Sequence, residues 1–481
     1  MLIVGAGISG IGGAYHLQQR CPTKSFVLLE TKETFGGTWA QHTYPGIRSD
    51  SDLYTFGYSF KPWTGPPIAA AGEILTYLNE VIDENDLRRH IRYQHTIVGA
   101  DWSSAAKHWV LDVERSDTGE MLRFTCGFLW MCAGYYRHSE GYTPDWPGID
   151  QYLGRIVHPQ TWPNDLDYMG KRVLVIGSGA TAATIIPAMA DDCEQITMLQ
   201  RSPTYFYPRP NSDELADTLR ELEIPDQWVH EIMRRKILRE GHIVHQLSAE
   251  HPDLVINELL TAARGYLGDD FDIDTHFRPS YRPWTQRIAV VPDGDLFKGI
   301  RSGKVDVVTD QIDTFTEKGV KLVSGTELEA DIIVTATGFN LNALGDAEMT
   351  LDGQPIDYAD SVTYRGIMFS GIPNMSSVFG YLRTSWTMRA DLISGFVCRL
   401  LNHMDELGVT VCTPTIAEAD DDMERKPYIP PDEFNPGYMI RGRDLMPKQG
   451  PHAPWAATND YYLEKDEIPA IDLDEPELQY R

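Results

Sequence analysis

Short runs of apolar residues that end in glycine or in an acid give the chain its first recognisable order. Leu2–Val4 lead into a glycine turn and a helix-compatible stretch up to Gln19, and Phe26–Leu29 then end at Glu30. Unbroken apolar runs of this length are typical of strands buried on both faces of a parallel sheet. The order strand, turn, helix, strand predicts the opening of a doubly wound α/β sheet.

The same order returns in the middle of the chain. Val173–Ile176 lead into glycines and a helix up to about Ala190, and Ile196–Gln200 form the next apolar run. Two such openings in one chain of 481 residues predict an α/β protein with two doubly wound, Rossmann-like dinucleotide-binding domains.

The remaining segments divide between these two units. Residues 90–113 alternate like antiparallel strands, residues 212–266 have the spacing of a helical insertion, and residues 387–408 have that of a long amphipathic helix. Leu129–Gly134 and Ile332–Gly338 are further buried strands that end in glycine. We therefore expect a discontinuous first domain, built on the first glycine turn, and a second domain, built on the second glycine turn, that contains the helical insertion. Their predicted bounds are residues 1–140 and 332–481 for the first domain and 150–331 for the second.

The first glycine turn predicts a nucleotide site. Gly5, Gly7 and Gly10 fit the GxGxxG pattern, which allows a tight turn, a close approach of backbone N–H groups to a pyrophosphate, and close packing of helix on strand. Glu30 ends the next strand, where a carboxylate binds ribose hydroxyls. FAD is favoured over NAD because a further glycine turn, Gly36-Gly37, follows this acid. That turn contains Gly37, Thr38 and Trp39.

The second nucleotide motif ends differently. Gly177 and Gly179 begin a GxGxxA pattern that includes Thr181. The strand after it ends in Arg201 and Ser202 instead of an acid. An arginine attracts the 2′-phosphate that a carboxylate would repel. The second site is therefore predicted to bind NADPH rather than NADH.

Two nucleotide sites imply hydride transfer from NADPH to FAD, after which the reduced flavin passes its electrons on. The six cysteines are scattered without a CxxC pair, which weighs against a flavin disulfide reductase and indicates a reducing, cytoplasmic location. The sequence has no iron–sulfur or zinc spacing, so we expect no metal. Molecular oxygen is then the favoured electron acceptor.

Charge and hydropathy narrow the partners. The formal net charge of −28 argues against a nucleic-acid partner and against an anionic membrane surface. No apolar run reaches the ~18 residues of a membrane-spanning helix. No signal peptide is recognisable, and Met1 begins inside the first predicted strand, which leaves open whether residues upstream are missing.

Two stretches of the chain resemble a known family. Residues 36–50 fit the pattern (A/G)GxWxxxx(F/Y)P(G/M)xxxD of class B flavoprotein monooxygenases, and residues 152–163 resemble the FxGxxxHxxxW(P/D) fingerprint of type I Baeyer–Villiger monooxygenases. Gly154, His158 and Trp162 match that fingerprint, whereas Tyr152 replaces its leading phenylalanine. The resemblance spans nearly the whole chain and looks strongest to the branch that includes the ethionamide-activating monooxygenase.

The resemblance implies roles for several residues. Asp50 is expected beside the flavin, where it holds the catalytic Arg287. His158 would couple NADP binding to domain movement, and Trp162 would shape the domain interface. Tyr381, Ser385 and Trp386 are expected either to approach the flavin or to pack in the core.

The expected activity follows from the family's chemistry. Reduced FAD adds O2 to give a C4a-peroxyflavin, which Arg287 stabilises as an anion because a guanidinium stays charged. Attack on a ketone inserts one oxygen atom and gives an ester or lactone, and sulfides or thioamides can be oxygenated in the same site. The natural substrate and the oligomeric state are not predicted.

Three alternatives remain open at this point. The first is an N- or S-oxygenating flavin monooxygenase without Baeyer–Villiger activity, against which the fingerprint argues. The second is an NADPH oxidase that releases hydrogen peroxide. The third is a flavin- or nucleotide-binding regulator without catalysis, which Asp50 and Arg287 together disfavour.

Overall fold

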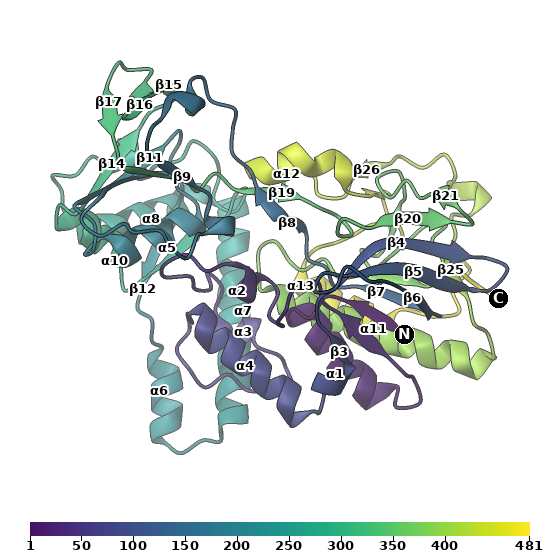
Figure 1. Cartoon of the computed structure of the whole chain (residues 1–481). Helices are drawn as coiled ribbons and strands as arrows, with labels where there is room; N and C mark the ends of the chain where they lie inside the picture. Colours follow the sequence, from purple (N-terminus) through teal and green to yellow (C-terminus); the bar gives the residue numbers. More distant parts are fainter.

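Two parallel five-stranded sheets organise the chain (Figure 1). The computed structural model describes residues 1–481. The first sheet has the strand order β24-β7-β1-β2-β3. Its strands are β1 (Leu2–Val4), β2 (Val27–Leu29), β3 (Ile91–Arg92), β7 (Leu129–Met131) and β24 (Met375–Ser377).

The first sheet is buried on both faces, which explains its unbroken apolar runs. Ile3, Leu28 and Trp130 pack into the core that contains α1 (Ile8–Arg20), α4 (Ala71–Glu84) and α11 (Trp386–Leu407). Leu2 and Leu29 face the opposite way, into a second core against a mixed, mostly antiparallel sheet. That sheet consists of β4 (His95–Ser103), β5 (His108–Arg115), β6 (Met121–Cys126), β20 (Glu348–Leu351) and β21 (Gln354–Pro355).

The second parallel sheet repeats this three-layer design, with the order β14-β11-β10-β18-β9. Val173 and Val175 pack towards helices, whereas Leu174 and Ile176 pack towards a three-stranded antiparallel sheet. The strands are β9 (Arg155–Val157), β10 (Arg172–Ile176), β11 (Gln195–Gln200), β14 (Val305–Thr309) and β18 (Ile332–Thr335). The covering elements are α5 (Ala180–Met189), α8 (Pro252–Leu267), α10 (Asp295–Arg301), β15 (Ile312–Thr316), β16 (Gly319–Leu322) and β17 (Glu327–Glu329).

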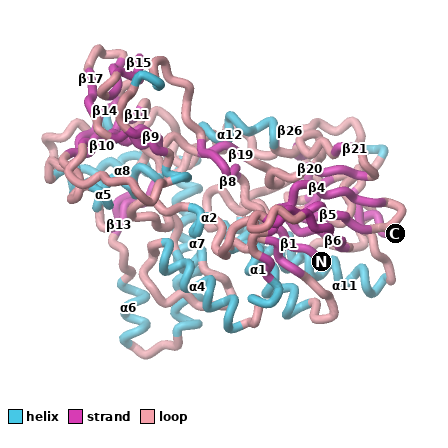
Figure 2. Tube along the Cα trace, in the orientation of Figure 1, coloured by secondary structure: helices cyan, strands magenta, loops and turns pink.

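One predicted domain boundary is wrong. The sequence prediction placed residues 332–335 at the start of the second FAD-domain segment, but β18 pairs in parallel with β10 and β9 and so belongs to the second sheet. The chain crosses between the units twice, through β8 (Tyr136–Gly141) and β19 (Phe339–Leu341), which pair with each other. At the end of this ribbon the N–H of Tyr142 donates to the carbonyl oxygen of Gly338 at 3.0 Å. The two crossings therefore lie side by side (Figures 1 and 2).

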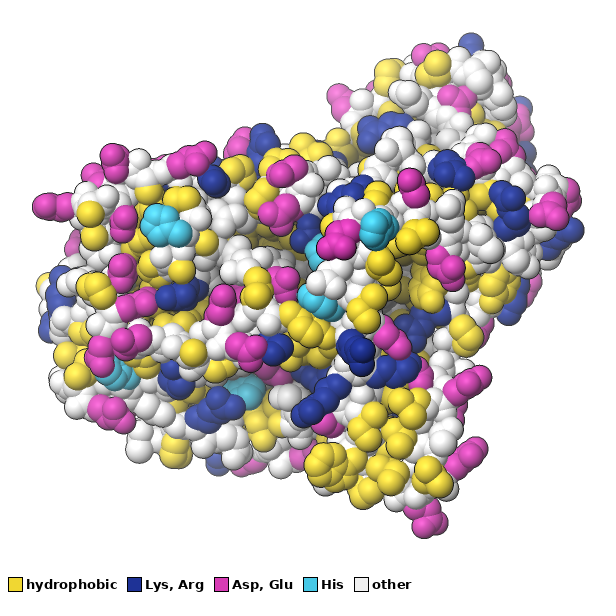
Figure 3. Space-filling view, turned by 180° about the vertical axis from the view of Figure 1, so that it is seen from behind, with side chains coloured by type: hydrophobic (Ala, Val, Ile, Leu, Met, Phe, Trp, Pro, Cys, Tyr) yellow, Lys and Arg dark blue, Asp and Glu magenta, His cyan; other side chains and the backbone are white.

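The helical insertion is present as predicted, in α6 (Glu214–Glu221), α7 (Asp226–Glu250) and α8. α7 also packs on α3 (Leu53–Phe56) of the first unit. The buried guanidinium of Arg234 donates to the carbonyl oxygens of Tyr54, Thr55 and Gly57 at 3.2, 3.3 and 2.8 Å. The insertion is therefore fastened to both units. Its projecting end exposes hydrophobic side chains (Figure 3), among them Leu215, Leu222 and Trp228.

The C-terminal segment is mostly loop, with a few short elements (Figure 2). No helix combines the length and the apolar character that crossing a bilayer requires. The remaining helices are α2 (Thr38–Gln41), α9 (Ile273–Phe277), α12 (Gly437–Gly442) and α13 (Tyr461–Glu467). The remaining strands are β12 (Phe206–Arg209), β13 (Ala289–Pro292), β22 (Thr363–Tyr364), β23 (Met368–Phe369), β25 (Cys412–Pro414), β26 (Lys426–Pro427), β27 (Lys448–Gln449) and β28 (Leu478–Tyr480).

Candidate dinucleotide sites and active site

A cavity of about 1050 Å³ lies between the two units, where Figure 3 shows a hollow. It is lined by both glycine turns, each of which follows the central strand of its sheet. This is the edge at which doubly wound sheets bind ligands. The cavity brings together most of the predicted site residues: Gly5, Gly7, Glu30, Gly37, Thr38, Trp39, Asp50, Gly177, Gly179, Thr181, Arg201, Ser202 and Arg287.

In the first glycine turn each glycine has its own reason. Gly5 has φ +98°, which side-chain-bearing residues rarely adopt. A Cβ on Gly10 would lie 1.9 Å from the carbonyl oxygen of Gly5. Gly10 thus lets α1 pack against the turn and does not line the cavity. A Cβ on Gly37 would lie 3.1 Å from the Cα of Gly7. The Gly5–Gly10 turn and the Gly36-Gly37 turn are therefore in contact, and the narrow space beside them suits a pyrophosphate.

Glu30 joins the first turn to the end of β2. Its carboxylate accepts the N–H of Ala6 at 2.8 Å and the N–H of Lys32 at 2.9 Å. Burial raises the pKa of Glu30, and the hydrogen bonds from Lys32 and Ala6 oppose that rise. Each carboxylate oxygen retains a lone pair that can accept a ribose hydroxyl.

The second glycine turn is more open. Gly177 has φ +132°, and a Cβ there would lie 2.2 Å from the carbonyl oxygen of Ala336. Gly179 has no neighbour within 4 Å of an added Cβ, so the N-terminus of α5 faces free space in the cavity. Arg201 and Ser202 line the same cavity beyond β11. No carboxylate lies within 4.0 Å of the Arg201 guanidinium. These residues fit a dinucleotide with an additional phosphate.

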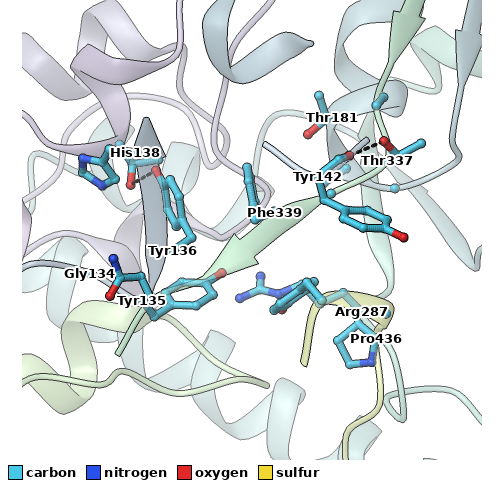
Figure 4. A pocket seen from close by; sticks show the side chains of 18 of the residues that line it. Gly134, Tyr135, Tyr136, His138, Tyr142, Thr181, Arg287, Thr337, Phe339 and Pro436 are labelled. Atoms are coloured by element: carbon cyan, nitrogen blue, oxygen red, sulfur yellow. Dashed lines mark hydrogen bonds between the residues drawn. The ribbon is translucent and has the colours of Figure 1, made fainter. Parts of the chain in front are cut away.

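Arg287 and Asp50 meet in the cavity, although they come from different units. Nη1 of Arg287 donates to Oδ2 of Asp50 at 3.1 Å, and their side chains are 35% and 31% exposed. Protein surrounds the guanidinium, so this exposure is to the cavity. Burial opposes its charge, but Asp50, Tyr135 and Tyr438 together raise the pKa of Arg287. The residue is therefore a fixed cation at any physiological pH. Figure 4 shows the hydroxyl end of Tyr135 directed at the guanidinium.

The fingerprint residues lie outside this cavity, beneath the two crossings. Nε2 of His158 is 3.2 Å from the carbonyl oxygen of Gly338, and a Cβ on Gly141 would overlap the His158 ring. A Cβ on Gly154 would lie 2.3 Å from the hydroxyl of Tyr152. Trp162 packs on the helical face of the second sheet. His158 therefore contacts both crossing segments.

Tyr381, Ser385 and Trp386 were expected either near the flavin or in the core. Trp386 lines the cavity and stacks on Tyr135 at 5.2 Å between ring centroids. The other two pack in the interior. Tyr381 donates to Glu464 at 2.7 Å, and the hydroxyl of Ser385 is 2.6 Å from that of Thr55.

Comparison with known proteins adds the family. Residues 62–217 match the model described as flavin-binding monooxygenase-like, and residues 3–67 match the NAD(P)-binding Rossmann-like domain. The chain is 46% identical to the FAD-containing monooxygenase EthA of Mycolicibacterium smegmatis, over 100% of this chain and 96% of that protein. It is 43% identical to the probable FAD-binding monooxygenase AlmA of Acinetobacter baylyi, over 100% and 95%.

The chain belongs to the FAD-containing monooxygenases.

The fold of this monooxygenase agrees with that family. The structure of an oxidized steroid monooxygenase bound to NADP superimposes with a TM-score of 0.77 at 23% identity, over 100% of this chain and 98% of that one. The predicted α/β fold class and the predicted flavin monooxygenase family are both confirmed.

The sequence did not mark several residues that line the cavity of this monooxygenase together with Arg287. Tyr135 and Tyr142 follow the glycine-ended strand β7, and Tyr438 and Arg441 lie on α12. The tyrosines follow Ala133-Gly134, a strand end that the sequence did flag, so they could have been found there. α12 lies in a segment rich in proline and acids, where no periodicity indicated a functional element.

Proposed function

We propose that this monooxygenase consumes NADPH and inserts one oxygen atom of O2 into ketones, giving esters or lactones, and that it also oxygenates sulfides or thioamides. The observation that carries the proposal is the Arg287–Asp50 pair at 3.1 Å in the cavity shared by both glycine turns. The pair stands where two cofactors and a substrate can meet. The other oxygen atom of O2 leaves as water, and NADPH supplies the two electrons.

The two turns divide the cofactors between them. The first turn, with Glu30 and the Gly36-Gly37 turn, would hold FAD. Gly177, Gly179, Thr181, Arg201 and Ser202 would hold NADPH. When bound, the flavin supplies the chemistry that transfers electrons from NADPH to O2. Both assignments rest on backbone clearance and on the contrast between Glu30 and Arg201.

Arg287 would supply positive charge where negative charge develops on the reacting oxygens. Its charge is preorganised, because Asp50 fixes one nitrogen and Tyr135 and Tyr438 flank the guanidinium. Such preorganised donors typically contribute ~3 kcal/mol at the barrier. Asp50 orients Arg287, and the surrounding aromatic side chains Tyr135, Trp386 and Tyr438 exclude water.

The setting of the reaction is a further part of the proposal. The partners are a small ketone or sulfide and O2. All six cysteines are buried and unpaired, which supports a reducing compartment such as the cytoplasm.

A substrate panel tests the function. Linear and cyclic ketones and a set of sulfides are incubated with FAD-loaded enzyme, NADPH and ¹⁸O2, and NADPH oxidation, hydrogen peroxide and products are measured together. We expect esters that carry one ¹⁸O atom, with little peroxide. Sulfoxides without any ester would favour the N- or S-oxygenating alternative. Peroxide equal to the NADPH consumed would favour an oxidase.

A further inference from the structure

The short helix α12 places two side chains in the cavity from one face. Tyr438 and Arg441 are three positions apart, so both project from the same side. Tyr438 lies beside Arg287. Arg441 lies farther along, at the crossing segments between the units. α12 therefore reaches both the catalytic arginine and the side of the cavity that contains the second glycine turn.

Arg441 is held in a defined position. Its guanidinium carbon lies 3.4 Å from the centre of the Tyr142 ring, and Nη2 donates to the carbonyl oxygen of Phe339 at 3.2 Å. An added Cβ on Gly338 would lie 3.8 Å from the same nitrogen. A stacked and hydrogen-bonded guanidinium has little rotamer freedom left to lose when it binds a ligand.

Arg441 has no acidic partner. Like Arg201, it has no carboxylate within 4.0 Å, whereas Arg287 is paired with Asp50. Burial and the positive charge of Arg201 lower the pKa of Arg441, and the neighbouring Tyr142 opposes this. Arg201 and Arg441 thus place two unpaired positive charges on one cavity, although the chain as a whole has a net charge of −28. An anionic ligand in the cavity could neutralise both.

The location of Arg441 relative to the second sheet indicates which part of a bound dinucleotide it would face. Ala336 and Gly338 follow β18, and the glycine turn follows the adjacent strand β10. These two segments are in contact at Gly177 and Ala336. Arg201 follows β11, on the other side of β10. A dinucleotide across this edge would place its 2′-phosphate at Arg201 and its pyrophosphate at the N-terminus of α5, on the Arg441 side.

We propose that Arg441 binds the pyrophosphate of NADP(H) opposite the N-terminus of α5, so that the first unit contributes a ligand to the dinucleotide held by the second unit. This inference rests on the proposed function, because it takes the second glycine turn as the NADPH site. Arg201 and Arg441 then have separate duties: the first recognises the 2′-phosphate and the second the diphosphate backbone.

The test measures binding to the oxidised, FAD-loaded enzyme by calorimetry, with NADP⁺ and 2′-AMP as probes. 2′-AMP carries the 2′-phosphate and no pyrophosphate. We expect Arg441→Ala to weaken NADP⁺ binding by about 10- to 100-fold, the usual loss for a hydrogen bond to a charged group, and to leave 2′-AMP binding unchanged. Arg201→Ala should weaken the binding of both probes.

Controls separate folding from binding. Arg443→Ala removes an exposed arginine two positions away, whose nearest acid is Asp444 at 3.8 Å, and should bind NADP⁺ as the wild type does. Arg441→Lys keeps the charge and should retain part of the affinity if Arg441→Ala folds poorly. Flavin content and Tm report the fold of each variant.

Two results would overturn the inference: unchanged NADP⁺ affinity in Arg441→Ala, or equal losses for NADP⁺ and 2′-AMP. The proposed function fails separately. In that case NADP⁺ binding depends on Arg441 as expected, yet the wild type forms no oxygenated product from any member of the substrate panel.

Discussion

Arg201 stands at the position in the second unit that Glu30 occupies in the first, at the end of the strand next to the glycine strand. The environments of the two residues differ as much as their charges. Glu30 is buried and already accepts two backbone N–H groups, whereas Arg201 is exposed to the cavity without a partner. One side chain per unit thus gives the first site an acceptor suited to ribose hydroxyls and the second site a cation suited to a phosphate.

At the residue scale, Arg287→Ala should separate reduction from oxygenation. NADPH should still reduce the flavin at nearly the wild-type rate, because Arg287 acts on the later chemistry. Product formation should fall by about 10²- to 10³-fold, as when one preorganised donor is removed, and peroxide should rise. Stopped-flow absorbance and product assays measure the two steps. Arg278→Ala, at an exposed pair with Asp274, is the control, and product formation preserved in Arg287→Ala would contradict the role.

His230 gives a pH-dependent prediction at the same scale. Its Nδ1 accepts the N–H of Trp63 at 3.1 Å, so the buried ring must stay neutral. Burial first, and Arg234 next, lower the pKa of His230 from 6.5 to about 4. Between these two values the unfolded chain binds a proton that the folded chain does not. The free energy of unfolding therefore falls as the pH falls through this window, by up to ~1.4 kcal/mol per pH unit.

The variant His230→Gln tests this linkage, because glutamine can accept the Trp63 N–H without binding a proton. Thermal unfolding from pH 7 to pH 4 should show a shallower loss of Tm for this variant than for the wild type. His452→Gln changes an exposed histidine and should leave the slope unchanged. Parallel curves for wild type and His230→Gln would mean that His230 does not contribute to acid sensitivity.

At the scale of elements, the two glycine turns differ in whether a glycine can be replaced by a residue with a side chain. Gly10→Ala places a methyl group 1.9 Å from a backbone oxygen, so α1 must move away from β1. We expect the free energy of unfolding to fall by about 1–3 kcal/mol, which is typical of overpacking, and the flavin content to fall as well. Gly179→Ala meets no neighbour and should keep its Tm while NADP⁺ binding weakens. Calorimetry and flavin absorbance distinguish the two, and equal Tm losses would contradict the expectation.

The elements also show what the sequence could determine. The strand–turn–helix openings were predictable because the apolar run, the glycines and the following Glu30 or Arg201 are neighbours along the chain. The sheet that contains β18 was not, because an apolar run that ends in glycine looks the same in either unit, and its pairing with β10 depends on residues far apart in sequence. α12 carries no local signal, since Tyr438 and Arg441 gain their meaning only from Arg287 and Tyr142, which other segments supply.

At the scale of the whole molecule, α7 holds the two units together. Arg234 donates to three carbonyl oxygens of the first unit and lies 3.8 Å from the partly buried Asp391. Arg234→Met leaves these acceptors without a donor and Asp391 without part of its compensation. We expect the free energy of unfolding to fall by ~3 kcal/mol and amide exchange in α7 to accelerate. The control Arg235→Met changes a neighbouring exposed arginine, and equal exchange in both variants would show that α7 is held by other contacts.

The meeting of the two crossings at Tyr142 and Gly338, whose backbones are joined by a 3.0 Å hydrogen bond, makes the second unit a cassette. The chain leaves the first unit and returns to it at nearly one point, and inserted domains with this arrangement tolerate exchange. A graft from a relative would have to match two junctions, the α7 contact at Arg234 and the surface facing α12. Because Arg201 and Arg287 both lie in the second unit, exchange of that unit would transfer the residue that selects the electron donor together with the catalytic arginine. The incoming arginine would then have to pair again with Asp50 of the resident first unit.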